Sequence, residues 1–429
     1  MARNPVQAAT ATFETPSLAS ATWLRNPALV KVFGALAASG YEARVVGGAV
    51  RNALLGQPVR DVDLASTAPP EEAMRAVTSA GLAAIPTGID HGTITVVSNH
   101  VPFEVTTLRR DVETFGRRAR VTYTTDWVDD ARRRDFTINA LYCGADGKIH
   151  DPLGGYCDLH ARRIRFIGSA TDRIREDYLR ILRFFRFTAE YADGEPDAEG
   201  LAACIREQAG MDALSGERMR AEILKLLIAP RALPTTTAMA SAGVLGRALG
   251  GNPDVVTFTR IVEIEAATGR GPEPLLRLAA LVAPCAAWET ETGIADRLKL
   301  SGAERTALDS ANTCDTALHA ASPESLAKAF IYRHGTKAFV AATLLHWARS
   351  GDPADHPPWH ARLRLAERFS PPVLPVSGRD VLALGITTGP EVGRILATFE
   401  AWWIGADFPT DPAQSAAKLC EIVAAKTFN

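Results

Sequence analysis

The sequence lacks the patterns that mark several large classes of protein. Its 429 residues contain no run of eighteen or more apolar residues, so no membrane-spanning helix is expected. The first twenty residues carry no apolar core of the signal-peptide type. Six cysteines are scattered without a CxxC pair, which favours a cytoplasmic protein with reduced thiols over a disulfide framework or a zinc site. A Walker A loop is also missing, which argues against a P-loop ATPase.

Neither sign of charge is in large excess, because the formal net charge is -2. Binding to a nucleic acid would therefore need a local basic face. Arginines are concentrated in two segments, residues 108–136 and 160–187. We expect contacts to phosphate groups from these two segments.

The hydrophobic periodicity changes near Gly168. Before this residue, alternating runs predict strands over 41–47, 59–66, 91–99 and 101–109, and short helices over 48–56 and 69–81. After it, the helical period continues through the rest of the chain. We expect an α+β protein with a small mixed, mostly antiparallel sheet in an N-terminal head. The expected parts are a flexible tail (1–22), the head (23–168), a helical neck (169–232) and a helical body and tail (233–429).

Two aspartates, Asp61 and Asp63, stand one residue apart in the otherwise apolar run 58–66. In an extended segment they project from the same face, where two carboxylates repel each other unless a cation lies between them. A Gly47–Gly48 turn and Arg51 precede them and are suited to hold phosphate groups. Mg²⁺ is commonly held by one or two carboxylates together with substrate phosphates.

Carboxylates beside a phosphate cradle predict nucleotidyl transfer. In this reaction a hydroxyl attacks the α-phosphate of a nucleoside triphosphate, and pyrophosphate leaves. Glu104, on a later strand, offers a third catalytic acid. The alternative is that Asp61 and Asp63 are solvated acids at a strand end and that Glu104 is an exposed strand residue. The carboxylate pair by itself leaves both interpretations open.

Five motifs follow one another between residues 40 and 250: "VVGGAVRNALLG…VRDVDLAS", "RRRDFTINALY", "DPLGGYCDL", "EDYLRILRFFRF" and "GERMRAEILKLLIAP". In sequence and in order they resemble the motifs of class II CCA-adding tRNA nucleotidyltransferases and bacterial poly(A) polymerases. Two positions depart from the family pattern. Asn52 stands where aspartate is usual, and Ala119 stands where proline is usual.

The resemblance implies roles for individual residues. Asp61 and Asp63 correspond to the metal-binding carboxylates, with Mg²⁺ as the cofactor. The residues implied to bind CTP or ATP are Gly47, Gly48, Arg51, Arg134, Asp135, Asn139, Asp177, Arg180, Arg183 and Arg186. The helical body is implied to bind the acceptor arm of tRNA. For the arginines of the segment 180–186 the alternative is a solvated basic face.

Asp177 and Arg180 offer a way for a protein to select bases. They are three residues apart and are expected to be neighbours on one helical face. A carboxylate accepts hydrogen bonds and a guanidinium donates them. Cytosine and adenine both present an amino donor beside a ring acceptor, whereas uracil and guanine do not. We therefore expect this pair to select C and A.

Other activities stay open from the sequence. The chain does not end in the strongly basic extension that poly(A) polymerases often carry, which favours CCA addition. The loop expected over 109–127 has its full length, which favours complete CCA addition over an enzyme that adds only CC or only A. A catalytically inactive RNA-binding protein is the remaining alternative, and the presence of Asp61, Asp63 and Arg134 argues against it.

Overall fold

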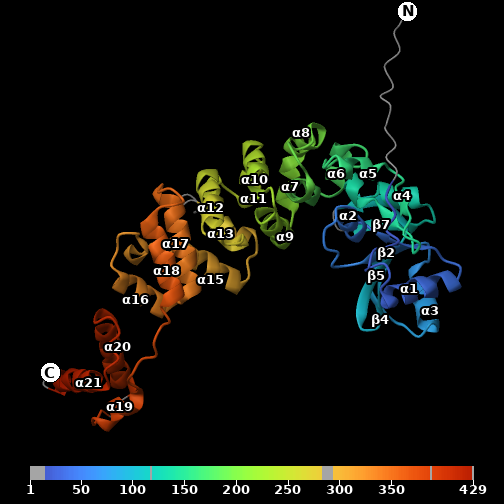
Figure 1. Ribbon diagram of the computed structural model, residues 1–429. Helices are drawn as coiled ribbons and strands as arrows, with labels where there is room; N and C mark the ends of the chain where they lie inside the picture. The colour runs from blue at the N-terminus through green and yellow to red at the C-terminus, as the bar shows by residue number, and fades with distance from the viewer. Residues whose placement is uncertain (1–14, 116–117, 283–292, 387–388, 428–429) are drawn as a thin grey trace, which may run out of the picture. The chain divides into compact units, whose positions relative to one another are not determined.

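The computed structural model describes residues 15–115, 118–282, 293–386 and 389–427. The chain divides after Ala248 into two compact units, which are described separately (Figure 1). The first unit contains all the strands of the described residues, and the second is helical. The expected α+β class with a helical remainder is thereby confirmed.

The head contains a seven-stranded sheet in the order β3-β4-β5-β2-β1-β8-β9. Its strands are β1 (Ala43–Val46), β2 (Asp63–Ser66), β3 (Ala83–Gly88), β4 (Thr93–Ser98), β5 (Val101–Thr107), β8 (Tyr142–Cys143) and β9 (Ile149–His150). Only β2 and β5 pair in parallel, so the prediction of a mostly antiparallel sheet is correct. The tight turn between β4 and β5 uses Asn99 and His100, both with positive φ, as a two-residue hairpin requires.

The segment expected to be a loop after β5 is mostly strand. β6 (Arg109–Phe115) and β7 (Arg118–Tyr123) pair antiparallel, with Arg109 opposite Tyr123 and Arg110 opposite Thr122. The prediction of a loop was wrong. The segment carries β-branched and aromatic residues at alternating positions, and their preference for strands outweighs the effect of the basic residues between them.

The helices of the first unit are α1 (Pro27–Ala38), α2 (Gly48–Leu54), α3 (Pro70–Ser79), α4 (Trp127–Arg132), α5 (Gly155–His160), α6 (Ala170–Glu176), α7 (Leu179–Tyr191), α8 (Ala198–Glu207), α9 (Gly216–Leu227), α10 (Ala232–Ser241) and α11 (Val244–Leu249). α1 and α3 pack together against β4 (Figure 1). The side-chain oxygen of Asn26 caps α1 by accepting the N–H of Ala28 at 2.9 Å.

The predicted flexible tail, 1–22, extends too far into the chain. Residues 1–14 lie outside the described residues, but Leu18 donates its N–H to the carbonyl oxygen of Gly147 at 2.8 Å. Residues just before the predicted head are thus attached to it.

The apolar stripe predicted on α7 is buried, as the spacing of Leu179, Leu182, Phe185 and Phe187 indicated. α7 packs against α9 and α10. The arginines of α7 are not on the opposite face, because the guanidinium groups of Arg183 and Arg186 lie 5.2 and 4.1 Å from the ring centre of Phe187. The predicted boundary between neck and body, at residue 232, falls inside the first unit, because α10 packs on α7 rather than with later helices.

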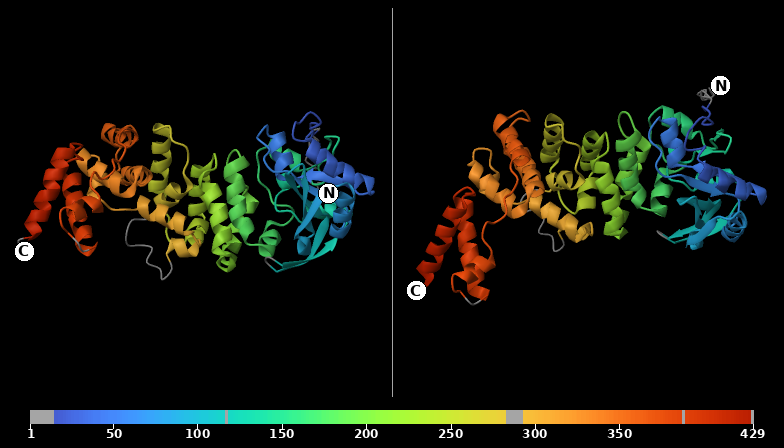
Figure 2. Two further views of the ribbon diagram at one scale, coloured as in Figure 1. Left: turned by 90° about the horizontal axis from the view of Figure 1, so that it is seen from below. Right: turned by 60° about the horizontal axis from the view of Figure 1, so that its bottom comes forward.

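The second unit consists of helices throughout its described residues. They are α12 (Val255–Ala267), α13 (Pro274–Ala280), α14 (Ile294–Arg297), α15 (Gly302–Ala311), α16 (Glu324–His334), α17 (Thr336–Ser350), α18 (Pro357–Arg368), α19 (Gly378–Ala383), α20 (Gly389–Gly405) and α21 (Pro412–Thr427). α17 lies against α12, α15 and α18 (Figure 2). No helix in the described part of the chain is long and apolar enough to cross a membrane.

The start of α5 packs unusually close to a neighbouring backbone. A Cβ added at Gly155 would lie 2.1 Å from the carbonyl oxygen of Thr137. We predict that Gly155→Ala lowers the free energy of unfolding by about 1–3 kcal/mol, because backbone must move. The measurement is urea unfolding followed by circular dichroism.

Gly34→Ala is the matched control for this substitution. Gly34 is exposed in the middle of α1, and no other atom lies within 4 Å of an added Cβ. It should raise stability by about 0.5–1 kcal/mol through helix propensity. If Gly155→Ala unfolds at the wild-type urea concentration, the close approach of α5 is not a constraint on the fold.

Candidate active site

Three carboxylates meet where β2 and β5 run in parallel. The register pairs Leu64 with Val105, so Asp63 and Glu104, one residue earlier on each strand, are neighbours. Asp61 lies two residues before Asp63, in the segment that leads into β2. All three acidic side chains are exposed. The parallel pairing therefore brings together acids that are far apart in the sequence.

The three carboxylates form an electrostatic environment suited to a cation. Desolvation raises the pKa of Asp63, the charges of Glu104 and Asp61 raise it further, and Arg134 acts in the opposite direction. Within the described ranges, no group of three or more His, Cys, Asp or Glu side chains is arranged to enclose a metal ion. A divalent ion held by Asp61 and Asp63 would complete its shell with substrate oxygens or water, as Mg²⁺ commonly does.

A pocket of about 750 Å³ opens beside the carboxylates, and we call it the arginine pocket. Asp63 and Glu104 belong to its wall, as do Asp135 and Asp177. The arginines that line it number eight: Arg51, Arg109, Arg133, Arg134, Arg180, Arg183, Arg186 and Arg218. Eight cations against four acids give the wall a net positive charge, which suits a triphosphate.

The turn between β1 and α2 brings backbone into this pocket. Gly47 has a φ of 70°, in the left-handed region that favours glycine, and donates its N–H to the carbonyl oxygen of Leu141 at 3.1 Å. A Cβ at Gly47 would lie 3.8 Å from Nη1 of Arg134. Gly48 follows as the first residue of α2. The two glycines leave the space that an anion would need next to the arginines.

Arg51 is buried and holds α2 against α7. It donates to Oδ1 of Asn139 at 2.5 Å, to the hydroxyl of Tyr191 at 2.7 Å and to Oδ1 of Asn52 at 3.1 Å. Its guanidinium also lies 4.0 Å from the ring centre of Tyr191. Burial lowers the pKa of Arg51. The acceptors of these three hydrogen bonds are all neutral, so the positive charge of Arg51 still favours an anion in the pocket.

Arg134 is fixed by a fully buried acid, Asp130. It donates to Asp130 at 3.1 Å and to the hydroxyl of Tyr142 at 3.3 Å. Arg133 and the hydroxyl of Tyr142 also donate to Asp130, each at 2.7 Å. Burial tends to raise the pKa of Asp130, but the charges of Arg134 and Arg133 outweigh it and lower the pKa. The network fixes where Arg134 stands in the wall.

Asp135 connects the head to α7. Arg183 donates to Oδ2 of Asp135 at 2.6 and 2.7 Å, and the amide of Asn139 donates to Oδ1 at 2.9 Å. Burial alone would raise the pKa of Asp135. The charge of Arg183, with hydrogen bonds from Asn139 and the N–H of Phe136, outweighs burial and lowers the pKa to about 2.

Asp177 and Arg180 do not stand side by side on one helix, so that expectation is corrected. Asp177 has extended backbone, with φ -155° and ψ 106°, and ends α6 before α7 begins. Its carboxylate accepts two N–H groups of Arg218, at 2.6 and 3.2 Å. Arg180 donates instead to Glu176 and to the carbonyl oxygen of Arg173. Asp177 and Arg180 nevertheless line the same pocket.

All the predicted site residues except Asp61 line the arginine pocket. Asp61 lines an adjoining pocket of about 660 Å³, to whose wall Asp63 and Glu104 also belong. The structure therefore brings the predicted residues together around the carboxylates. The role of each one stays a prediction. Ala119 lies among residues whose side chains are outside the described part of the chain.

Sequence reasoning missed the acids and the arginine that position the predicted residues. Asp130 and Glu176 each precede a pocket arginine by four residues, and this spacing was available as a signal, although each arginine lies beyond the end of the helix that carries the acid. Arg218 and Glu222 carried no local signal, since they lie more than thirty residues from the partners they contact. Glu222 accepts Nε of Arg186 at 2.5 Å.

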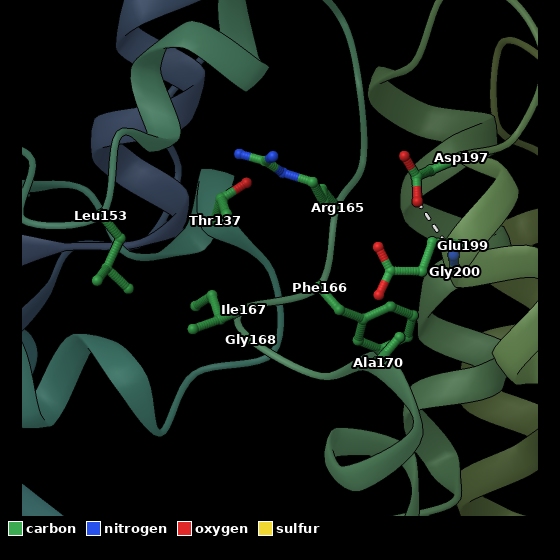
Figure 3. A pocket seen from close by; sticks show the side chains of 10 residues that line it. All are labelled: Thr137, Leu153, Arg165, Phe166, Ile167, Gly168, Ala170, Asp197, Glu199 and Gly200. Atoms are coloured by element: carbon green, nitrogen blue, oxygen red, sulfur yellow. Dashed lines mark hydrogen bonds between the residues drawn. The ribbon is translucent and has the colours of Figure 1, made fainter. Parts of the chain in front are cut away.

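A smaller pocket, of about 250 Å³, lies elsewhere in the first unit. Figure 3 shows Arg165 and Thr137 on one side of it and Asp197 and Glu199 on the other. The carboxylate of Asp197 caps α8, since it accepts a hydrogen bond from the N–H of Gly200 at 3.0 Å. None of the predicted site residues lines this pocket.

Comparison with known sequences shows which proteins this chain is similar to. The poly(A) polymerase head domain profile matches residues 43–165. The chain is 35% identical over 376 residues to the mouse (Mus musculus) protein "CCA tRNA nucleotidyltransferase 1, mitochondrial", with 86% of this chain and 84% of the mouse protein covered. It is 40% identical over 194 residues to a Streptococcus pyogenes "CCA-adding enzyme", covering 45% of this chain and 47% of that protein.

Solved structures give the same result for the fold. The Bacillus stearothermophilus CCA-adding enzyme in complex with CTP superposes with a TM-score of 0.71 and 28% sequence identity, covering 94% of this chain and 98% of that one. The Thermotoga maritima CCA-adding enzyme complexed with tRNA has a TM-score of 0.65 at 19% identity, with 92% and 93% covered, and supports the fold alone.

The lowered pKa of Asp135 predicts a pH-dependent contribution to stability. A carboxyl whose pKa falls from 3.8 to about 2 on folding stabilises the protein above about pH 4, and this is lost as the pH falls towards 2. Asp135→Asn should therefore cost about 2 kcal/mol of unfolding free energy near neutral pH, and less with acidification. Urea unfolding from pH 7 to pH 3 measures the difference.

Arg183→Gln is the control for this prediction. It removes the cation that lowers the pKa of Asp135 but keeps the carboxyl, and the same pH-dependent part of the stability should disappear. A constant difference between wild type and Asp135→Asn across the pH range would contradict the assignment.

Proposed function

Because the chain belongs to the family of CCA-adding tRNA nucleotidyltransferases, we propose that it adds C, C and A to the 3′ end of tRNA from CTP and ATP without a nucleic-acid template. The observation that carries the proposal is the arginine pocket, whose wall combines eight arginines with Asp63 and Glu104. Such a wall binds a triphosphate and presents carboxylates to its reacting end.

The reaction follows from what each part of the pocket can hold. The 3′-oxygen of the RNA forms a bond to the α-phosphorus, and the bond from that phosphorus to the oxygen bridging to the β-phosphate breaks. Pyrophosphate leaves, and the hydroxyl proton passes to solvent. Arg51, Arg134 and Arg183 face the negative charge of the phosphates, which increases on the leaving group.

Enzymes of this family use divalent metal ions. We propose Mg²⁺ for this chain, held by Asp61 and Asp63, with Glu104 as the neighbouring third acid. The crowded carboxylates, which raise the pKa of Asp63, fit a divalent cation with oxygen ligands. When bound, Mg²⁺ stabilises charge on the attacking and leaving oxygens.

Base selection is assigned to Asp177 and Arg180. Arg218 donates one hydrogen bond to each oxygen of Asp177, and the backbone N–H of Leu179 donates a second one to Oδ1 at 3.2 Å. A carboxylate has about four acceptor sites, so Oδ2 can still accept an amino group. In this proposal, Arg218 holds the carboxylate of Asp177 in the orientation in which the carboxylate contacts the base. Glu176 plays the corresponding part for Arg180. Asp177 and Arg180 thus reach the base from the start of α7 and not from one helical face.

We also propose that the protein acts in the cytoplasm. The described cysteines, which are all except Cys285, are free thiols. The mouse, zebrafish and human relatives are named as mitochondrial, so fractionation of cells is the measurement that checks this part of the proposal.

The direct test uses tRNA transcripts that end at the discriminator base, in C, or in CC. With CTP and ATP together, the protein should extend them by three, two and one nucleotides respectively. With ATP alone, a lengthening series would indicate a poly(A) polymerase. Arrest after CC, or extension of the CC transcript alone, would indicate a CC-only or an A-only enzyme.

Asp63→Asn should remove most of the incorporation, because it removes a carboxylate proposed to hold the metal. Binding of tRNA in a filter assay should stay close to that of the wild type. Asp146→Asn, which changes an exposed carboxylate outside both pockets, is the control. Near-normal turnover by Asp63→Asn would remove Asp63 from the proposed site.

Asp177→Ala should weaken the choice between bases. Its carboxylate no longer accepts the amino group of C or A, and no longer repels the carbonyl oxygen of U or G. Discrimination should fall by on the order of 1–3 kcal/mol, the scale of a bidentate base contact. The measurement is kcat/KM for the four triphosphates. Unchanged ratios of CTP to UTP and of ATP to GTP would show that Asp177 does not read the base.

A further inference from the structure

A second pocket shares the carboxylates with the arginine pocket. We call it the Trp23 pocket; its volume is about 660 Å³, and its wall includes Trp23, Arg60 and the exposed Val101. Asp63 and Glu104 belong to both walls, and Asp61 belongs to the Trp23 pocket alone. The carboxylates therefore separate two spaces of different composition.

We infer that the Trp23 pocket receives the 3′-terminal nucleotide of the RNA, whose hydroxyl attacks the nucleoside triphosphate. The inference rests on the proposed function and assigns a place to the second reactant. Its occupant is a single-stranded RNA end, which carries one base, one ribose with a free hydroxyl, and one phosphate on the 5′ side.

The geometry of phosphoryl transfer requires two spaces on either side of the carboxylates. The attacking and leaving oxygens lie roughly in line through the phosphorus. If the arginines hold the leaving pyrophosphate, the hydroxyl must approach from the other side of the α-phosphate. The Trp23 pocket contacts the same Asp63 and Glu104 from a space that contains none of the eight arginines.

The charges of the two pockets lead to the same assignment as the geometry: the RNA end in the Trp23 pocket and the triphosphate in the arginine pocket. The Trp23 pocket has one arginine, Arg60, against the three acids Asp61, Asp63 and Glu104. This wall repels a triphosphate but accepts a neutral hydroxyl and a single phosphate paired with one cation. The arginine pocket has the opposite balance.

Trp23 and Arg60 supply the contacts that a terminal nucleotide needs. Trp23 is half-buried just before α1, and within the described chain its indole N–H has no hydrogen-bond partner. A tryptophan face stacks with any base, which suits an enzyme whose primer end changes with each addition. Arg60 is exposed and makes no hydrogen bond or ion pair with the described residues, so it is available to a phosphate.

The test measures the two reactants separately with the full-length chain. Trp23→Ala and Arg60→Ala should each raise the KM for a tRNA transcript ending at the discriminator base. The rise for Trp23→Ala should be about fivefold or more, the lower end of what stacking one base contributes. The dissociation constant for CTP, measured by calorimetry without RNA, should match the wild type.

Matched variants separate this role from a structural one. Trp23→Phe keeps an aromatic face and should restore most of the KM. Arg60 is exposed, so Arg60→Ala should leave the fold intact, and Arg75→Ala, on an exposed arginine of α3 outside both pockets, should leave the KM unchanged. A transcript whose last nucleotide lacks its base should bind the wild type as weakly as Trp23→Ala binds the intact transcript. Combining the two changes should add little further loss.

Two outcomes would overturn the inference. In one, CTP affinity falls in parallel with tRNA affinity, which would assign the Trp23 pocket to the nucleotide. In the other, neither Trp23→Ala nor Arg60→Ala changes the KM for tRNA. Both outcomes are distinct from failure of the proposed function, which would show as a wild-type protein that adds no nucleotides to tRNA.

Discussion

The repulsion among eight arginines around one pocket is the constraint that the first unit must satisfy. Each guanidinium keeps its charge at neutral pH, so the arginines can stand close together only with acids between them. Asp130, Asp135 and Glu176 supply such charges to Arg134, Arg183 and Arg180. The compensation is incomplete, since Arg51 is held by neutral acceptors, and the remaining positive charge is what a triphosphate encounters.

The same ion pairs connect the head to the helices that follow it. Asp135, in the head, binds Arg183 of α7, and Arg51 of α2 donates to the hydroxyl of Tyr191 at the end of α7. The arginine pocket therefore lies along the contact between sheet and helices. If these arginines bind the triphosphate as proposed, a phosphate would compete with the groups that hold α7 in place, and nucleotide binding would be energetically linked to the position of α7.

The sequence predicted those features that depend on local spacing. Alternation placed β2, β4 and β5, and helical periodicity placed the buried face of α7. The predicted site residues lie together around the two adjoining pockets, and it was their occurrence in ordered motifs that grouped them; the role of each one stays a prediction. What failed depended on geometry that spacing does not encode. Asp177 stands three residues before Arg180, but the helix is interrupted between α6 and α7. The extended backbone of Asp177 turns its carboxylate to Arg218, which is far away in the sequence. Glu104 was predicted as a third acid beside the two aspartates, but the local pattern did not reveal the parallel pairing of β2 with β5 that sets it next to Asp63.

If the two pockets bind the two reactants as proposed, the carboxylates that they share would also let one protein distinguish two polyanions. Asp61, Asp63 and Glu104 would repel the triphosphate from the Trp23 pocket, and the arginines of the other pocket would attract it. The RNA end carries less charge at its terminus than the triphosphate does, so the same acids disfavour it less. Because Asp63 and Glu104 face both spaces, a cation bound by Asp63 would contact both reactants. In this proposal, the charge asymmetry of the two pockets orients the two reactants relative to the carboxylates before any base is selected.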